Sequence, residues 1–329
     1  MGDCDAPRKR GIVFLGDTMN LVKAFLLKAL SALLFALLSA CVRYLGEQSV
    51  PLGQMVFFRA AFAIVPVLLI DAWRRELADV IRTERPLGHL LRGAISMAGM
   101  FLNFAALARL PLVDATAISF AAPLITVAFA AWFLGERVRI YRWSAVAVGF
   151  AGIIVMLWPY LNLAQYAAGG SATVAATVGV VCGLAAAFTN AGSVIQTRRL
   201  TDTETTSSIV FFFSLFCAIA GLATLPFGWI WPSGMQLTVL IAAGLIGGLA
   251  HIVLTSSYRY APASLVAPLD YTTMIWAFVF GYALFGEVPT IYVFVGGAIV
   301  AASGIFVIWR ERQLGLRRVR EAEGPANIS

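Results

Sequence analysis

Two ionisable side chains lie inside long apolar stretches of the sequence, and they are the first candidates for chemistry. Arg59 is the eighth residue of an apolar segment over 52–70, about 10 Å from its start at 1.5 Å per helical residue. Asp270 is the eighth residue of another such segment, over 263–284. An ionisable group deep in a membrane-spanning helix is costly, so such groups mark binding sites, ion paths or proton relays.

These two residues predict different chemistry. For Arg59 two interpretations stay open: a structural clamp on helix carbonyls or hydroxyls, and an anchor or gate for an anionic group. Asp270 favours binding of a cationic group or proton coupling, because a carboxylate away from water takes up a proton or a cation readily. Their depths differ by roughly 10 Å in a bilayer core of about 30 Å, so a direct pair between them is left open.

Other polar, aromatic and proline residues accompany them. Asn103 and Asn190 are weaker candidates, because hydrogen bonds between helices would explain them equally well. Tyr271 follows Asp270 and is expected to form a wall of the site, with ordinary packing as the alternative. Pro123 and Pro268 are expected to kink their helices, which frees backbone carbonyls where a helix lines a cavity.

Motifs for metal, cofactor or covalent chemistry are absent from the sequence. The four cysteines lie far apart, and His89 and His251 are isolated, so neither a metal site nor a disulfide framework is predicted. No phosphate-binding loop, nucleophile elbow or HExxH motif occurs. We therefore expect no cofactor and no metal.

The composition indicates the medium that surrounds these residues. The chain is 60% hydrophobic and 12% charged, whereas soluble domains carry about 25% charged residues. A helix needs about 20 apolar residues to cross a bilayer, and ten segments meet that length approximately. The expected spans are 26–46, 52–70, 90–108, 113–133, 143–158, 174–195, 207–227, 237–257, 263–284 and 290–309.

The basic residues predict the orientation of these spans. Of the 24 lysines and arginines, all but Arg43, Arg59 and Arg109 fall in segments on one side, which is expected to be the cytoplasm. Both termini would then be cytoplasmic, in a bacterial inner membrane, with the first apolar run acting as an uncleaved signal anchor. The net charge of +7 is explained by this topology, so nucleic-acid binding is not expected.

The two halves of the chain resemble each other. With a shift of 151 positions Arg109-Leu110-Pro111-Leu112 falls on Tyr260-Ala261-Pro262-Ala263, and Gly135-Glu136 falls on Gly286-Glu287. A repeat of five helices is odd in number, so the second copy must cross the membrane inverted. Ser119 and Phe120 are then the equivalents of Asp270 and Tyr271 and are expected to face them.

The expected fold is an all-α membrane protein of ten transmembrane helices, arranged as two inverted five-helix repeats. Secondary transporters are commonly built in this way, with the substrate near the midplane between the halves. The chain divides into a cytoplasmic segment (1–25), a first repeat (26–158), a periplasmic linker (159–173), a second repeat (174–309) and a basic cytoplasmic tail (310–329).

Several of these motifs together resemble a known family. Each half is similar to the EamA unit of the drug/metabolite transporter superfamily, and the similarity covers roughly residues 25 to 310. It rests on Phe57-Phe58-Arg59, Arg85-Pro86, Ser119 to Leu124, Ala267 to Tyr271 and Phe285-Gly286-Glu287. The stretch from Arg85 to Pro159 is most similar to bacterial S-adenosylmethionine uptake transporters, with riboflavin importers as another similar group.

The resemblance implies alternating access without ATP. A small-molecule substrate would contact Arg59, Asn103, Ser119, Phe120, Asp270 and Tyr271. Uptake of a metabolite such as S-adenosylmethionine is the narrow expectation, and export of amino acids or drugs is the alternative. A lipid-modifying membrane enzyme is the rival from another class, but it should show clustered acids or histidines. The partners expected are the bilayer and the substrate, with the protein a monomer or a homodimer.

Overall fold

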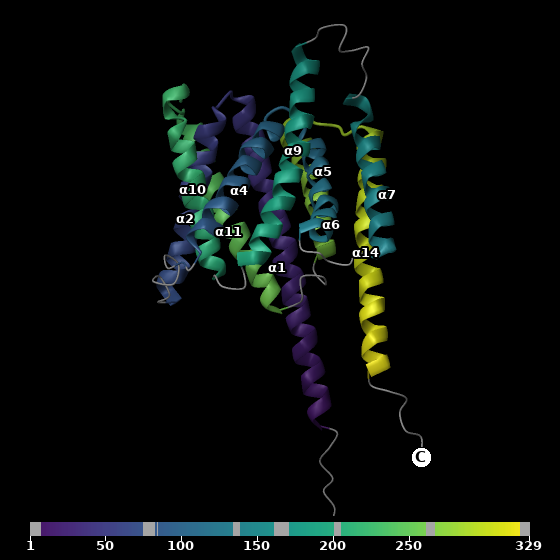
Figure 1. Ribbon diagram of the computed structural model, residues 1–329. Helices are drawn as coiled ribbons and strands as arrows, with labels where there is room; N and C mark the ends of the chain where they lie inside the picture. The colour runs from purple at the N-terminus through teal and green to yellow at the C-terminus, as the bar shows by residue number, and fades with distance from the viewer. Residues whose placement is uncertain are drawn as a thin grey trace, which may run out of the picture.

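The protein is a bundle of membrane-length helices (Figure 1). The computed structural model describes residues 8–74, 83, 85–133, 139–160, 171–200, 205–260 and 267–322. Both the start of the first helix and the end of the last project from one side of the bundle, which we name the terminal face; the opposite side is the far face (Figure 1).

The first half contains α1 (Arg8–Glu47), α2 (Leu52–Arg74), α4 (Pro86–Leu107), α5 (Leu112–Ser119), α6 (Ala121–Phe133), α7 (Ile140–Leu157) and the 3-10 turn η1 (Trp158–Tyr160). The second half contains α9 (Ser171–Leu200), α10 (Thr206–Ala223), η2 (Leu225–Phe227), α11 (Gly234–Tyr260), η3 (Ala267–Tyr271), α13 (Thr272–Phe285) and α14 (Ile291–Ala322).

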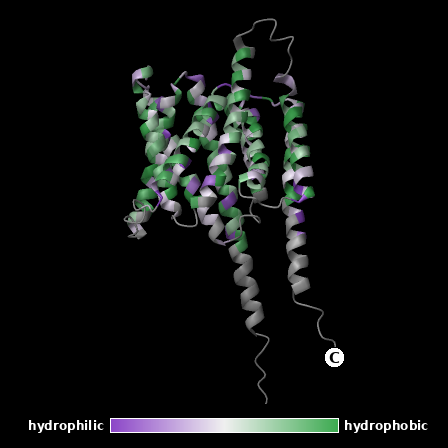
Figure 2. Cartoon of the chain, viewed as in Figure 1, coloured by the Kyte–Doolittle hydropathy of each residue, from purple (hydrophilic) through white to green (hydrophobic). Residues whose placement is uncertain are grey.

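The predicted apolar spans coincide with helices in every case. Seven of them match helices that are long and apolar enough to cross a membrane. The other three match the shorter apolar helices Ser207–Ala223, Leu269–Phe285 and Ile291–Val307. Apolar residues follow the helices along most of their length (Figure 2), and many large ones are exposed, such as Trp132, which is 73% exposed. Such a surface is suited to lipid.

Two helices extend beyond the expected spans at the terminal face. We expected the first span to begin at residue 26, but α1 begins at Arg8 and its apolar part begins at Leu21. At the other end of the chain α14 continues to Ala322, past the expected end at 309. A helix need not stop at the membrane surface, and the polar ends of these two helices are rich in basic residues.

The fourth and ninth spans are each interrupted at the same relative position. In the fourth, α5 ends at Ser119 and α6 begins at Ala121. Pro123 has no N–H to donate to the carbonyl of Ser119, four residues earlier, so a continuous hydrogen-bond ladder is impossible there. In the ninth, η3 ends at Tyr271 and α13 begins at Thr272, which is 151 positions after Ala121.

Helix contacts repeat the same internal symmetry. A Cβ atom added to Gly93 of α4 would lie 2.5 Å from the ring of Phe216 in α10. A Cβ atom added to Gly244 of α11 would collide with Phe62 in α2. Gly244 follows Gly93 by 151 positions and Phe216 follows Phe62 by 154, so these are one contact made twice. The halves are therefore related by an approximate two-fold axis, as an inverted repeat requires.

The halves interlock through equivalent helices. α1 packs along α11, and its equivalent α9 packs along α4; α2 packs against α10, and α7 against α14. The buried apolar core runs through these interfaces, from Val56 in α2 to Ile118 in α5 and Val293 in α14. The first three helices of each half surround the space in which the candidate site lies.

Candidate functional site

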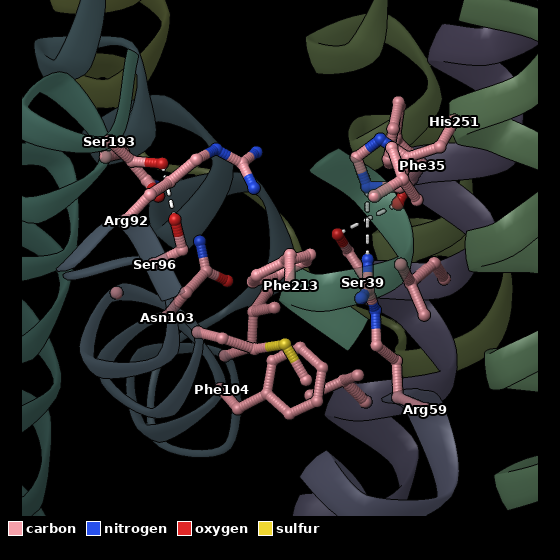
Figure 3. Close-up of a pocket in the computed structure, with 17 residues that line it drawn as sticks. Phe35, Ser39, Arg59, Arg92, Ser96, Asn103, Phe104, Ser193, Phe213 and His251 are labelled. Carbon is pink, nitrogen blue, oxygen red and sulfur yellow. Dashed lines mark hydrogen bonds between the residues drawn. The ribbon is translucent and has the colours of Figure 1, made fainter. Parts of the chain in front are cut away.

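A cavity of about 400 Å³ lies between the two halves of the protein. Its walls come from α1, α2 and α4 of the first half and from the equivalent helices α9, α10 and α11 of the second. Cavities of this size accommodate small metabolites. The close-up in Figure 3 shows polar and aromatic side chains that point into it from both halves.

Arg59 of α2 is held at one side of the cavity by a histidine. Its side chain is buried, with only 6% of the residue exposed, and Nη2 lies 3.2 Å from Nε2 of His251 in α11. A guanidinium only donates, so Nε2 accepts and the ring carries its proton on Nδ1. The ring of Phe35 packs against the same imidazole in a T-shaped arrangement, with centroids 5.1 Å apart. The histidine is therefore a neutral support that orients the arginine.

Arg92 of α4 lies at the opposite side of the cavity (Figure 3). Its Nε donates to Oγ1 of Thr197 over 2.7 Å, and its Nη1 donates to the carbonyl of Ile209 over 3.0 Å. α4 begins at Pro86, which places Arg92 well inside the helix. The residue is thus part of the cavity wall and not of the connector before the helix.

The ring of Phe213 in α10 lies between the two arginines (Figure 3). The guanidinium carbon of Arg59 is 5.7 Å from its centroid, and that of Arg92 is 5.6 Å from it. An aromatic face attracts a cation but does not neutralise it. Phe213 follows Arg59 by 154 positions, so these two contacting residues are also equivalents in the repeat.

The remaining polar groups of the cavity are uncharged. The hydroxyls of Ser96 and Ser193 are hydrogen-bonded across α4 and α9, and Asn103 and Asn190 also line the space. Among the described residues that line the cavity there are two arginines and no carboxylate. The described residues also contain no cluster of histidine, cysteine and acidic side chains suited to a metal. The charges of the cavity walls therefore favour binding of an anionic group.

The structure brings only some of the predicted site residues into this cavity. Arg59 and Asn103 line it, whereas Ser119, Phe120 and Tyr271 do not. Phe120 and Tyr271 contact each other, with ring centroids 5.0 Å apart, so these two equivalent residues face each other as expected. The hydroxyl of Ser119 donates to the carbonyl of Thr116 over 2.6 Å, within its own helix.

Asp270 is also outside the cavity, and it is not a lone carboxylate. Its Oδ1 lies 2.6 Å from Nζ of Lys28 in α1. The lysine side chain is 2% exposed, while that of Asp270 is 53% exposed. The open question of a pair between Arg59 and Asp270 is thereby answered, because each has a different partner. Pro268 lies in η3, two residues before Asp270.

A second charged cluster lies at the far face. Nε of Arg43 in α1 lies 3.1 Å from Oε1 of Glu287, and its Nη1 donates to the carbonyl of Ala108 over 3.4 Å. Oε2 of Glu287 accepts the backbone N–H of Leu112 over 2.6 Å. These contacts join α1 to the segments around α5 and α13 and close the bundle there. Glu136, the equivalent of Glu287 in the first repeat, lies outside the described residues.

Sequence reasoning missed three charged or titratable residues in these sites. Arg92 is counted with the basic residues of the cytoplasmic side, although it lies within the predicted third span and Pro86 is a typical first residue of a helix. Lys28 is likewise counted with the basic residues of the cytoplasmic side, but α1 begins 20 residues earlier, at Arg8. His251 was regarded as isolated, and nothing in the sequence indicates its contact with Arg59.

The chain is similar over most of its length to several proteins that are named for transport. The S-adenosylmethionine uptake transporter of Rickettsia felis is 26% identical, over 84% of this chain and 89% of its own length. The riboflavin transporter of Rhizobium johnstonii is 29% identical, over 89% and 91%. The pseudopaline exporter of Pseudomonas aeruginosa is 28% identical, over 87% and 96%. All three names describe transport, and they differ in substrate and direction.

The chain also matches a solved structure and a family model. A protein of known crystal structure, 19% identical, covers 88% of this chain and 98% of its own with a TM-score of 0.62, which shows a shared fold. Residues 22–158 and 177–310 each match the model of the EamA-like transporter family. Since both halves match, the chain belongs to the EamA-like transporter family and is a membrane transporter.

Proposed function

We propose that this protein is a secondary active transporter that moves a small metabolite across a bacterial inner membrane by alternating access. The observation that carries the proposal is the position of the cavity, which is enclosed by equivalent helices of two inverted halves. Two related packings of such halves have similar energies, and each opens the same site to a different side.

The charged cluster of the far face supports this mechanism. Arg43, Glu287 and the backbone of Leu112 close the bundle at that face. In this proposal these contacts break when the bundle opens toward the far face, and the cluster acts as a gate. The terminal face is then the cytoplasmic one, in agreement with the distribution of lysine and arginine.

Uptake of an S-adenosylmethionine-like metabolite is the narrow form of the proposal. The Rickettsia relatives carry that name, and they match this chain over most of its length. Export is the second candidate, because a relative that is 28% identical is named an exporter. Asp270 is proposed as the proton-coupling or cation-binding residue, reached through its exposed carboxylate, with Phe120 and Tyr271 beside it.

Counterflow in proteoliposomes tests the mechanism. Vesicles are loaded with unlabelled S-adenosylmethionine or riboflavin, and the entry of the labelled compound is followed with the proton gradient collapsed. A carrier exchanges internal unlabelled substrate for external labelled substrate, so the label accumulates transiently inside the vesicles. A channel only lets the labelled compound equilibrate across the membrane. Transient accumulation is expected for at least one compound and not in protein-free vesicles. Simple equilibration would contradict alternating access, and accumulation of riboflavin alone would contradict the S-adenosylmethionine proposal.

A further inference from the structure

The cavity contains more positive charge than its own walls compensate. Only 6% of the surface of Arg59 is exposed, and its Nη1 has no hydrogen-bond partner among the described residues. Arg92 donates to protein groups through Nε and Nη1, and its second terminal nitrogen takes part in neither of these two hydrogen bonds. A buried cation without a counter-charge is expensive, particularly inside a membrane.

The geometry of the two guanidinium groups limits what could compensate them. Both face the ring of Phe213, at 5.7 and 5.6 Å from its centroid, and they approach it from opposite sides of the cavity (Figure 3). His251 is already an acceptor for Arg59, and the nearby Ser96, Ser193 and Asn103 are neutral. Guanidinium groups bind carboxylate and phosphate oxygens in pairs of parallel hydrogen bonds.

We infer that the substrate of this transporter carries an oxyanion, a carboxylate or a phosphate, and that Arg59 and Arg92 bind that group beside the ring of Phe213. The inference rests on the proposal that the cavity holds the transported compound. Lining residues such as Met100 and Phe104 then contact the less polar part of the molecule. A compound without an oxyanion would leave both arginines uncompensated and would bind weakly.

The broken symmetry of the repeat supports a specific role for these arginines. Under the shifts that relate the halves, Arg59 corresponds to Phe213 and Arg92 corresponds to Ala243. The scaffold therefore accepts an apolar residue at either position. Packing of the helices alone does not require two arginines here, whereas recognition of an anion does.

Matched pairs of ligands test the inference on the unmodified protein. Binding to the purified transporter is measured by calorimetry for S-adenosylmethionine against its methyl ester, and for riboflavin 5′-phosphate against riboflavin. We expect the oxyanion form to bind at least about tenfold more tightly in one pair, and the pair that responds distinguishes carboxylate from phosphate. Equal binding within both pairs, or no binding in either, would overturn the inference.

Charge-removing variants then assign the preference to the two arginines. Arg59→Gln and Arg92→Gln should each reduce it about tenfold or more. Arg109→Gln is the matched control, because Arg109 is exposed and donates to the carbonyl of Ala105 outside the cavity. A preference that persists in both cavity variants, or that is lost equally in the control, contradicts the assignment. If a variant does not fold, the ligand pairs on the unmodified protein still decide.

Counterflow separates this inference from the proposed function. Exchange of riboflavin without any preference for an oxyanion would overturn the inference and leave the transport mechanism intact. Arginine-dependent binding of an oxyanion without counterflow of the bound compound would do the reverse. The oxyanion site would then stand, and the proposed transport of that compound would fail.

Discussion

The ammonium group of Lys28 lies 2.6 Å from the carboxylate of Asp270, and the pair joins the middle of α1 to the interrupted ninth span. The lysine is buried and the aspartate is half exposed, so the pair has an apolar side and an accessible side. An ion pair of this kind is sensitive to the loss of one member, because the buried charge remains.

Replacing Asp270 by asparagine should destabilise the protein by about 1–3 kcal/mol, since Lys28 loses a carboxylate while it stays buried. The double variant Lys28→Met/Asp270→Asn should recover much of that loss. Thermal unfolding in detergent and a double-mutant cycle measure both effects. Glu47→Gln is the control, because the side chain of Glu47 is 40% exposed in its i,i+4 pair with Arg43 and its loss should change stability little. Unchanged stability with lost proton dependence of transport would instead make Asp270 a coupling residue only.

Cross-linking Arg43 to Glu287 should stop transport by holding the far face closed. Both positions are changed to cysteine in a background without the four native cysteines, and they are joined by a short bis-maleimide. Counterflow should fall to background. The matched control is Arg43→Cys/Glu47→Cys, whose members both lie on α1, so its cross-link joins no separate elements. Exchange that continues in the fully cross-linked Arg43→Cys/Glu287→Cys protein would show that the gate lies elsewhere.

Gly304→Ala should destabilise the protein by about 1–3 kcal/mol through overpacking. A Cβ atom at this position of α14 would overlap the hydroxyl of Tyr271 and lie 2.8 Å from its ring carbon Cζ. Adding Tyr271→Phe should recover part of the loss, because it removes the nearest atom. Gly234→Ala is the control, since a Cβ atom there meets nothing within 4 Å. A thermal unfolding curve for each variant distinguishes these outcomes, and equal effects of the two alanines would contradict the contact.

Tyr160→Phe should cost about 1–3 kcal/mol, because it removes a donor from a buried carboxylate. The hydroxyl of Tyr160 donates to Asp114, which is 6% exposed at the start of α5. Tyr282→Phe removes the same atom from a residue that is 62% exposed and should be close to neutral. Thermal unfolding compares the two. A neutral Tyr160→Phe would mean that Asp114 does not depend on this hydrogen bond.

The sequence allowed the helices to be predicted because a bilayer imposes a length and a polarity on each of them. It also allowed the inverted repeat to be predicted, since Gly93 and Gly244 keep their spacing where a Cβ atom cannot fit. Helix ends were less predictable. Because α4 begins at Pro86 and not at residue 90, Arg92 lies well inside the helix and in the cavity wall. The long start of α1 likewise places Lys28 in the middle of that helix, inside the bundle.

The candidate site was only partly predictable, because it depends on which helix faces meet. Arg59 was identified from its cost inside a membrane, but its partner His251 is 192 residues away in the sequence. Asp270 was identified by the same reasoning, although its neighbour in space is Lys28 and not the cavity. A charge in an apolar segment indicates that some compensation exists, whereas only the folded arrangement reveals which group supplies it.

The contact of Arg59 with Phe213 has a consequence for how such a protein can have arisen. If two identical half-length chains formed the bundle, every residue near the axis would meet its own copy, and an arginine would face an arginine. Joining the halves in one gene removes that restriction, so each copy can acquire a different residue by mutation. A fused chain can therefore place a cation and an aromatic ring at equivalent positions, whereas a symmetrical dimer of identical halves cannot.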